Sequence, residues 1–254
     1  MKMFDLTGRK AIVTGAAQGL SRGMAEGLME AGAEVCILDI NPNVLNVAEE
    51  YKKQGYKCHG VIVNLGNVDE RKKAFSAAVA ALGDHLDILV NSAGVQRRYK
   101  SEEFPLEDWE FVLNINLTAV FSLCQMAANQ FFKQNSKGKI INVASMLSFF
   151  GGYTVPAYAA SKGGVAQITK AFCNEWASKG INVNAVAPGY MDTEMNTALT
   201  NPDNPRFKEI TNRIPANRWG KPEDMKGPVV FLASDASDYL NGAIIPVDGG
   251  YLVK

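Results

Sequence analysis

Short apolar segments that alternate with longer amphipathic ones restrict the fold of this chain more than any other feature. Each short segment is rich in aliphatic and β-branched residues and is bounded by turn residues, which is typical of a buried strand. Strands that alternate with helices pair in parallel and carry helices on both faces of the sheet. The sequence therefore predicts an α/β fold, a doubly wound, seven-stranded parallel sheet in three layers. The predicted strands are Lys10–Thr14, Glu34–Asp39, Lys57–Val63, Asp87–Val90, Lys139–Val143, Asn182–Ala187 and Ala243–Val247.

The segments between the strands predict helices and one irregular region. No repeat or linker interrupts the 254 residues, so residues 1–254 are expected to form a single domain. The segment 194–218 carries Pro202, Pro205 and Pro215, and we expect it to be irregular and to form a mobile lid over about 190–218. The helix 158–178 is too apolar for one buried face, which suggests a helix from another subunit against it. The other predicted helices are one that ends at Ala31, Val44–Gln54, Asp69–Leu82, Leu106–Lys133 and Glu223–Ser234.

A glycine-rich turn, Gly15-Ala-Ala-Gln-Gly19-Leu, follows the first strand and opens a helix. In this arrangement the backbone N–H groups and the helix N-terminus can hold a pyrophosphate, as in Rossmann-type folds. Two glycines in such a turn can also serve the backbone alone, so the turn needs support from the rest of the chain. We expect dinucleotide contacts from Gly15, Gln18, Gly19 and Leu20.

Asp39 ends the second strand and is the residue expected to select the cofactor. Its carboxylate can accept both hydroxyl groups of an adenosine ribose. The alternative is a cap for the next helix, a role for which Asn41 competes better. No basic residue follows Asp39 directly, and an uncharged Gln18 precedes Gly19, so the 2′-phosphate of NADP would meet a negative charge. The sequence therefore favours NAD over NADP.

Small or polar residues follow the remaining strands as well. The carboxyl ends of parallel strands meet at one edge of the sheet, and this is the edge at which such sheets bind ligands. Further cofactor contacts are therefore expected from Asn64, Leu65, Asn91, Ala93, Gly94, Pro188, Gly189, Met191 and Thr193.

Tyr158, Lys162 and Ser145 are the candidate reactive residues. Tyr158 and Lys162 are four residues apart, so a helix places them on one face, and a nearby ammonium favours the phenolate of a group whose ordinary pKa is about 10. Ser145 follows the strand Lys139–Val143 and can face the pair. Interconversion of an alcohol and a ketone needs a proton donor, a group that holds the oxygen and a cation. The alternative is a solvated helix face, because this spacing also occurs by chance.

Asn116 is a second candidate within the helix 106–133. Asn114 and Asn116 lower the helix propensity of an otherwise apolar segment. An amide on an apolar face needs a hydrogen-bond partner. We expect a functional role for Asn116, with a structural buried amide as the alternative.

Charge and residue counts exclude several classes of function. Lys plus Arg and Asp plus Glu both total 26, which argues against nucleic-acid or membrane-surface binding. No apolar run is expected to approach the roughly 20 residues of a membrane span, and the N-terminus lacks an apolar signal core. Four cysteines without C-x-x-C spacing suggest free buried thiols and a cytoplasmic protein. The two histidines lack metal-ligand spacing, so neither a metal site nor a Ser-His-Asp enzyme is expected.

Together these motifs resemble the short-chain dehydrogenase/reductase family over the whole chain. Three positions depart from the family pattern: Ser21 stands for a usual glycine, Ser92 for a usual asparagine and Asn64 for a usual aspartate, and we expect them to adjust cofactor packing. The matching residues are Thr14–Leu20, Asn91–Gly94, Asn116, Ser145, Tyr158–Lys162, Pro188, Gly189 and Thr193.

The resemblance implies a role for each member of a catalytic tetrad. Tyr158 would be the general acid and base, and Lys162 would lower its pKa and hold the nicotinamide ribose. Ser145 would hydrogen-bond the substrate oxygen, and Asn116 would position a water that links Lys162 to solvent. Hydride would pass between the nicotinamide and the substrate carbon. The family also implies a homotetramer.

Within the family the chain is most similar to dehydrogenases of sugar acids. For an acidic substrate the expected contacts include Arg97 or Arg98, because a guanidinium matches a carboxylate with two hydrogen bonds. The alternative for these arginines is a solvated position or an ion pair with Glu102 or Glu103. The other expected substrate contacts are Ser145, Met146, Tyr158 and Tyr190. The similar segments are Val95–Arg98, Ala144–Phe149, Val155–Tyr158, Asn174–Ala177, Pro188–Met191, Arg213–Ala216, Arg218–Gly220 and Asp248–Leu252.

Three other functions remain open from the sequence. Another polyol or ketone reductase of the same family would use the same tetrad. A reductase of neutral, apolar ketones would have little use for paired arginines at its pocket. A catalytically silent NAD-binding sensor would not need an intact tetrad.

Overall fold

The computed structural model describes residues 2–201 and 203–254, and its seven strands form one parallel sheet, as predicted. The strand order is β3-β2-β1-β4-β5-β6-β7. The direction of winding reverses between β1 and β4, and ligands bind at such a switch point in open α/β sheets. The strands are β1 Lys10–Thr14, β2 Glu34–Asp39, β3 Cys58–Ile62, β4 Ile88–Asn91, β5 Gly138–Val143, β6 Ile181–Pro188 and β7 Ile244–Val247.

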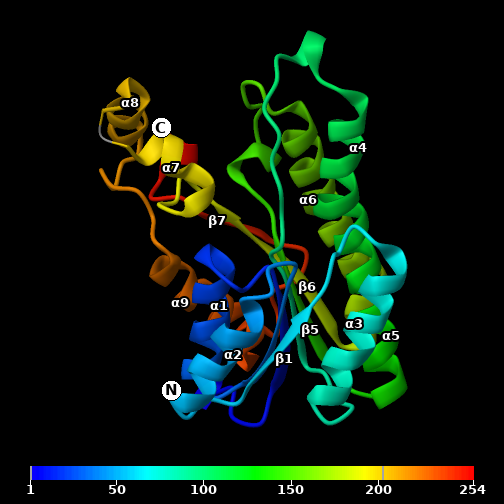
Figure 1. Cartoon of the computed structure of the whole chain (residues 1–254). Helices are drawn as coiled ribbons and strands as arrows, with labels where there is room; N and C mark the ends of the chain where they lie inside the picture. Colours follow the sequence, from blue (N-terminus) through cyan, green and yellow to red (C-terminus); the bar gives the residue numbers. More distant parts are fainter. Residues whose placement is uncertain (1, 202) are drawn as a thin grey trace.

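Helices cover both faces of the sheet, with α1, α2 and α9 on one side and α3, α5 and α6 on the other (Figure 1). Most helix ends lie within two residues of the predicted ones. The helix expected over 223–234 begins as a 3₁₀ turn and continues as α9. The helices are α1 Gly19–Glu30, α2 Val44–Lys53, α3 Val68–Ala81, α4 Leu106–Leu113, α5 Ala119–Gln134, α6 Pro156–Trp176, α7 Thr197–Thr200, α8 Pro205–Arg213 and α9 Lys226–Ala233.

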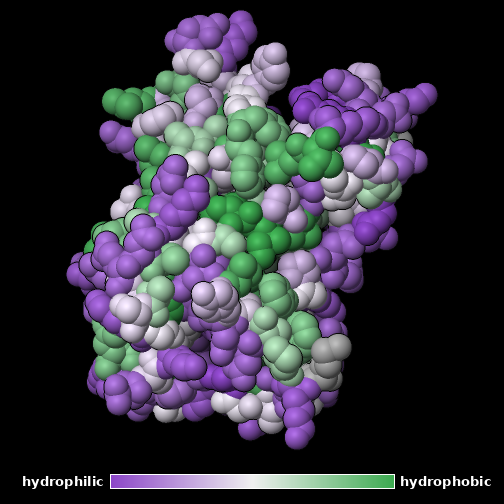
Figure 2. All heavy atoms as spheres, turned by 180° about the vertical axis from the view of Figure 1, so that it is seen from behind, coloured by the Kyte–Doolittle hydropathy of each residue, from purple (hydrophilic) through white to green (hydrophobic). Residues whose placement is uncertain are grey.

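Two hydrophobic clusters fill the space between the sheet and its two helical layers. In β1, Ile12 packs toward α3 and α5, whereas Ala11 and Val13 pack toward α1 and α9. Both faces of the central strands are therefore apolar, as expected for a parallel sheet covered on both sides. Seen from behind, hydrophobic residues gather in the middle of the molecule and hydrophilic residues cover its periphery (Figure 2).

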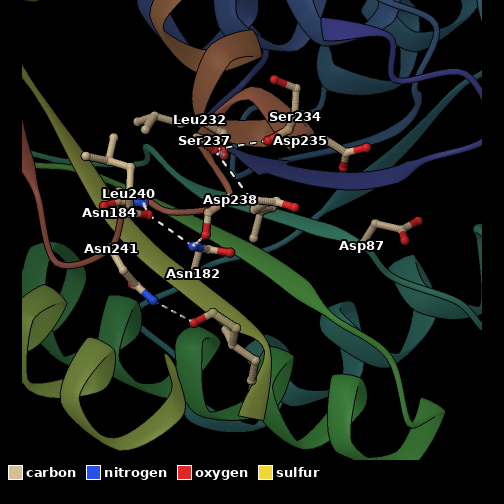
Figure 3. Close-up of polar contacts among 12 residues, drawn as sticks. Asp87, Asn182, Asn184, Leu232, Ser234, Asp235, Ser237, Asp238, Leu240 and Asn241 are labelled. Atoms are coloured by element: carbon tan, nitrogen blue, oxygen red, sulfur yellow. Dashed lines mark hydrogen bonds and ion pairs between the residues drawn. The ribbon is translucent and has the colours of Figure 1, made fainter. Parts of the chain in front are cut away.

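Polar side chains hold together the amino-terminal edge of the sheet (Figure 3). Asn182, near the start of β6, donates to the carbonyls of Asp238 and Leu240, both at 3.0 Å. Asn241 donates to the carbonyl of Ile181 at 3.1 Å and accepts the N–H of Val183 at 2.7 Å. These contacts fix the loop before β7 to the end of the sheet that faces away from the glycine-rich turn.

The segment expected to be irregular over 194–218 is largely helical. Pro205 occupies the first turn of α8, where its missing N–H costs nothing, and the side chain of Asn204 accepts the N–H of Arg206 as an N-cap. The prediction was wrong because it took each proline as a helix breaker. The prediction also rested on Pro202 and Pro215, and Pro202 lies outside the described residues.

A third, smaller cluster packs beneath α8 at the carboxyl-terminal edge of the sheet. It joins Met146, Trp219 and Tyr251 to Ile210 and Ile214 of the α8 region. Residues far apart in the sequence therefore meet under this segment, which gives the helical part of 194–218 a packed base.

The helix predicted over 106–133 contains a π-helical turn, Asn114–Thr118, between α4 and α5. Among the described residues, Leu106–Gln134 is the one helical stretch long and apolar enough to cross a membrane by length and composition, so the expectation that no apolar run approaches a span was wrong. In the fold, α5 packs Leu123, Ala127 and Phe131 into the main core, and this burial accounts for its apolar composition.

Candidate active site

A cavity of about 620 Å³ lies at the carboxyl-terminal edge of the sheet, between the ends of β1, β2, β4, β5 and β6. It brings together most of the residues predicted from the sequence. The predicted residues in its wall are Gly15, Gln18, Gly19, Leu20, Asp39, Asn64, Leu65, Ala93, Gly94, Arg97, Ser145, Tyr158, Lys162, Pro188, Gly189, Met191 and Thr193.

The glycine-rich turn leaves room for a ligand on its cavity side. Gly15 has φ +72°, and a Cβ there would lie 2.7 Å from the Cα of Ala93, so only glycine fits. Gly19 has φ +60°, and the place of its Cβ is open space at the start of α1. A phosphate needs such a surface of backbone N–H groups at a helix N-terminus. The turn therefore fits the pyrophosphate of a dinucleotide.

Asp39 is fastened to this turn and still faces the cavity. One carboxylate oxygen accepts the N–H of Ala17 at 3.0 Å, and the other accepts the N–H of Asn41 at 2.9 Å. The α2 helix begins at Val44 with Asn43 as its N-cap, so Asp39 does not cap it. Each carboxylate oxygen can accept a further hydrogen bond. The carboxylate is thus fixed in position with acceptor capacity left for a ribose.

Tyr158 and Lys162 lie on one face of α6, as predicted. The Nζ atom of Lys162 is 5.6 Å from the centre of the Tyr158 ring. Ser145 follows β5 and caps a short 3₁₀ turn, where its hydroxyl accepts the N–H of Leu147 at 3.2 Å. Ser148 in that turn donates to the carbonyl of Lys162 at 2.7 Å. The turn and the helix therefore hold the three candidate reactive side chains in the wall of the cavity.

Burial shifts both titratable groups of this wall. It raises the pKa of Tyr158, and hydrogen bonding with Ser145 opposes that shift. Desolvation of the phenolate therefore outweighs this hydrogen bond in the protein alone, and the expectation that Lys162 lowers the pKa of Tyr158 stays a prediction. Burial also lowers the pKa of Lys162 to about 8. Its Nζ donates to the carbonyl of Val143 at 2.6 Å, and no carboxylate of the described residues pairs with it.

Asn116 is fully buried behind the cavity wall, in the π-helical turn. Its amide donates to the Val95 carbonyl at 2.9 Å and accepts the Val95 N–H at 2.8 Å. It also donates to Ser161 at 3.2 Å, and Ser161 donates to the carbonyl of Tyr158 at 2.7 Å. Asn116 thus supports the segment after β4 and the first turn of α6, and its side chain is one layer behind the cavity surface.

Arg97 and Arg98 have different surroundings. Arg97 lines the cavity, and its guanidinium lies over the ring of Phe111 with the carbon 4.7 Å from the ring centre. Its Nε donates to Asp108 at 3.1 Å, so the expected alternative partners Glu102 and Glu103 are not the ones used. Arg98 is exposed and is not part of the cavity wall. The structure therefore places Arg97, and not Arg98, in the cavity wall.

Three further predicted residues do not line the main cavity. Asn91 is buried and donates to Asn142 at 2.9 Å and to Cys124 at 3.2 Å. Met146 belongs to the cluster beneath α8, and Tyr190 packs its ring against Trp219 and Tyr251. Each of the three residues is a sequence neighbour of a wall residue: Ser92, Ser145 or Gly189. Packing against other elements turns their side chains away from the cavity, and the sequence did not predict that packing.

Several wall residues were not predicted from the sequence. Ser21 and Ser92, noted only as departures from the family pattern, bind each other with their hydroxyls 2.7 Å apart. A larger residue at position 21 and a smaller one at position 92 are consistent with this contact, and the two departures together were the available signal. The other residues that were missed are Ile40, Asn41, Val95, Phe111, Ile115, Val143, Ala144, Glu194 and Asn196.

Comparison with known proteins places this site in a family. The family model described as enoyl-(acyl carrier protein) reductase matches residues 15–252. The 2-dehydro-3-deoxy-D-gluconate 5-dehydrogenase of Escherichia coli (strain K12) is 47% identical over 254 residues, which cover 100% of this chain and 99% of that protein. The enzyme of the same name from Bacillus subtilis (strain 168) is 45% identical and covers 99% of this chain and 97% of its own.

A solved structure agrees with these relatives. The gluconate 5-dehydrogenase from Burkholderia cenocepacia J2315, in complex with NADP and tartrate, superposes with a TM-score of 0.95 and 37% identity, covering 100% of this chain and 98% of that one. The fold agrees with the resemblance inferred from the motifs. The chain is therefore a member of the short-chain dehydrogenase/reductase family, whose enzymes are NAD(P)-dependent oxidoreductases.

Proposed function

We propose that this protein is an NAD-dependent dehydrogenase of a sugar acid. Its substrate is 2-dehydro-3-deoxy-D-gluconate, and the enzyme interconverts the hydroxyl group and the ketone at carbon 5. The observation that carries this proposal is the presence of Arg97 in the same cavity wall as Ser145, Tyr158 and Lys162. One group can bind a carboxylate while the others act on a hydroxyl or carbonyl group. Relatives with this activity are 45–47% identical over nearly their whole length.

Each residue of the wall has a chemical task in this reaction. A bound nicotinamide accepts or supplies the hydride. Tyr158 takes the proton from the substrate hydroxyl in oxidation and returns it in reduction, and Ser145 holds the same oxygen by a hydrogen bond. Lys162 has three N–H donors, of which one goes to Val143, so two remain for a ribose and for stabilising the phenolate. Asn116 keeps the first turn of α6 in place through Ser161.

Asp39 supports NAD as the preferred cofactor. Its carboxylate faces the cavity and would repel a 2′-phosphate, as inferred from the sequence. The Burkholderia relative is in complex with NADP, so cofactor choice within the family needs a direct measurement. Steady-state kinetics with NAD and NADP at equal concentrations decides it, and a preference for NADP would overturn this role of Asp39.

Arg97 supports an acidic substrate. Asp108 binds only its Nε atom and Gln96 accepts from Nη1 at 3.2 Å, so the guanidinium keeps donors for a carboxylate. Stacking on Phe111 and the ion pair with Asp108 limit its rotation. Binding a substrate to a side chain that is already oriented costs less conformational entropy.

The experiment is a panel of sugar acids and matched neutral polyols with NAD, followed by absorbance of NADH. Arg97→Ala should raise KM for the acid roughly tenfold, equivalent to about 1.4 kcal/mol, and leave activity on a neutral polyol nearly unchanged. Arg98→Ala is the matched control, because Arg98 is exposed and outside the wall. Equal losses on acid and neutral substrates would contradict the sugar-acid assignment.

Gluconate is the second candidate substrate, because the Burkholderia structure with a TM-score of 0.95 is a gluconate 5-dehydrogenase. The same panel separates the two by their kcat/KM values. Turnover of any member would also dismiss a catalytically silent sensor. A preference for neutral, apolar ketones would favour a reductase of another class.

A homotetramer in the cytoplasm completes the proposal. Leu106, Phe111, Phe121 and Phe132 are exposed apolar residues along α4 and α5, beside the apolar α6. Such a row is suited to packing against another copy of the chain. Light scattering should give four times the monomer mass, and the free state of all four cysteines agrees with a reducing compartment.

The segment 190–218 remains the proposed lid. Met191, Thr193, Glu194 and Asn196 lie in the cavity wall, so movement of this segment would open or close it. We propose that α7 and α8 move together as a packed helical unit. Slower proteolysis of this segment with NADH and substrate present than with neither is the expected result.

A further inference from the structure

The π-helical turn Asn114–Thr118 presents three successive side chains to three parts of the molecule. Ile115 lines the cavity, and Asn116 holds Val95 and Ser161 behind the reactive residues. Asn114 has no part in that support. π-helical turns inside α-helices are frequent at functional sites. The side chain of Asn114 contacts a different part of the cavity wall from the part that Asn116 supports.

Asn114 binds the loop between β3 and α3. Its amide donates to the Gly66 carbonyl at 2.9 Å. Gly66 closes a turn in which its N–H binds the side chain of Asn64 at 2.9 Å. The buried Arg71 donates to the next carbonyl, that of Leu65, at 2.6 Å. Asn114 and Arg71, which lie on two different helical elements, thus hold the consecutive carbonyls of Gly66 and Leu65.

The held loop forms one end of the cavity. Asn64 and Leu65 line the wall, and β3 pairs with β2 up to the register Asp39 with Ile62, so this loop lies beside Asp39. Ser145 follows β5, and Tyr158 and Lys162 lie on α6. In the strand order, β5 is four strands along from β3. If Asp39 holds the ribose of an adenosine, Asn64 and Leu65 are at the adenosine end and far from the hydride.

A purely structural amide explains these contacts less well. Asn114 is only half-buried, so its amide could be hydrated by water if the loop moved away. The hydrogen bond is between a side chain and the loop that forms the cavity wall, and it spans 48 positions of the sequence. It therefore constrains the wall more than it constrains the helix.

We propose that Asn114 is a positioning residue that fixes loop 64–66 for the adenosine half of the dinucleotide. It acts through the Gly66 carbonyl and does not itself line the cavity. The inference rests on binding of a dinucleotide in this cavity and is independent of which substrate is oxidised. The proposal assigns the adenosine half of the cofactor site to Asn114, while Asn116 supports the segment near Tyr158 and Lys162.

The test measures binding of two fragments of the cofactor by calorimetry. Asn114→Ala should weaken ADP-ribose about fivefold, the usual size of one lost hydrogen bond, and leave nicotinamide mononucleotide unchanged. KM for NAD should rise by the same factor, with kcat at saturating NAD within twofold. Asn46→Ala is the matched control, since Asn46 is exposed on α2 and its amide donates to the neighbouring Asn43.

The two fragments distinguish positioning from a general structural role. Equal weakening of both fragments, or no weakening of ADP-ribose, would overturn the assignment. If Asn114→Ala does not fold, Asn114→Asp keeps the volume and points a carboxylate at the Gly66 carbonyl. It should weaken ADP-ribose more than tenfold if positioning is the role. Failure of the sugar-acid assay would leave these binding results unaffected.

Discussion

Two lysines whose ammonium groups lie near opposite ends of β5 have opposite surroundings. Lys139 is the second residue of β5 and is 9% exposed, and its Nζ contacts Asp238 at 2.7 Å and Ser237 at 3.4 Å. Lys162, on α6, is 4% exposed, and its Nζ donates to the carbonyl of Val143, the last residue of β5. Lys139 thus has a carboxylate partner, whereas no carboxylate of the described residues pairs with Lys162.

The same contrast extends to the two edges of the sheet. At the amino-terminal edge, Arg9 pairs with Asp87 and Asp235. Asn182 and Asn241 use their amides on backbone groups (Figure 3). At the carboxyl-terminal edge, polar groups line an open cavity with hydrogen-bonding capacity left over. Polar residues that satisfy one another stabilise the fold, whereas unsatisfied ones in a cavity favour a ligand.

The largest expected effect is at Tyr158. Tyr158→Phe keeps the packing of the ring and removes the proton donor, so kcat should fall by about 10²–10⁴. Binding of NADH should change little, because Ser145 and Lys162 remain. Turnover above half of the wild-type value would show that the carboxyl-terminal edge does not use this tyrosine.

Lys162→Met should lower turnover and stabilise the fold at neutral pH. The pKa of Lys162 is lowered from its ordinary 10.5 to about 8, so the folded protein disfavours the ammonium. At pH 7 this penalty is complete, and removing the charge should raise the free energy of unfolding by up to about 3 kcal/mol.

The free energy of unfolding should depend on pH in the direction set by the unpaired ammonium of Lys162. Between pH 8 and pH 10.5 the unfolded chain holds the proton that the folded protein releases, so wild-type stability rises with pH in that window. The advantage of Lys162→Met should therefore shrink as pH rises above 8. Urea unfolding at pH 7 and pH 10 measures it, and a destabilised variant at pH 7 would contradict an unpaired ammonium.

Asp39→Ala should weaken NAD by roughly 1–3 kcal/mol, the scale of lost hydrogen bonds to a charged group. The advantage of NAD over NADP should narrow, because the negative charge facing a 2′-phosphate is gone. Loss of the contact to Ala17 should also loosen the glycine-rich turn. Dissociation constants for both dinucleotides check this, and an unchanged ratio would remove Asp39 from cofactor selection.

The smallest effect is expected at Lys139. Hydrogen bonding to Lys139 lowers the pKa of Asp238, whose side chain is half exposed, so solvent screens the pair. Lys139→Met should cost less than about 1 kcal/mol at pH 7 and leave kcat unchanged. The cost should disappear at acid pH, where Asp238 is protonated. A drop in kcat would show that the two edges are not independent.

The sequence predicted the strands and most of the cavity wall because those signals are local. Each strand is a short apolar run, and residues such as Gly15, Asp39 and Ser145 follow a strand directly, so parallel topology alone places them at one edge. The spacing of Tyr158 and Lys162 is likewise fixed by one turn of a helix.

Tertiary packing decided the rest, because it depends on contacts between distant parts of the chain. Arg97 and Arg98 are adjacent, and only the position of Asp108 and Phe111 puts the first into the cavity. The direction of the pKa shift at Tyr158 depended on how much water the fold removes, which sequence spacing does not determine. The sequence thus determined which residues follow the strand ends near the site, and the packed structure determined which of them line the cavity and what charge they favour.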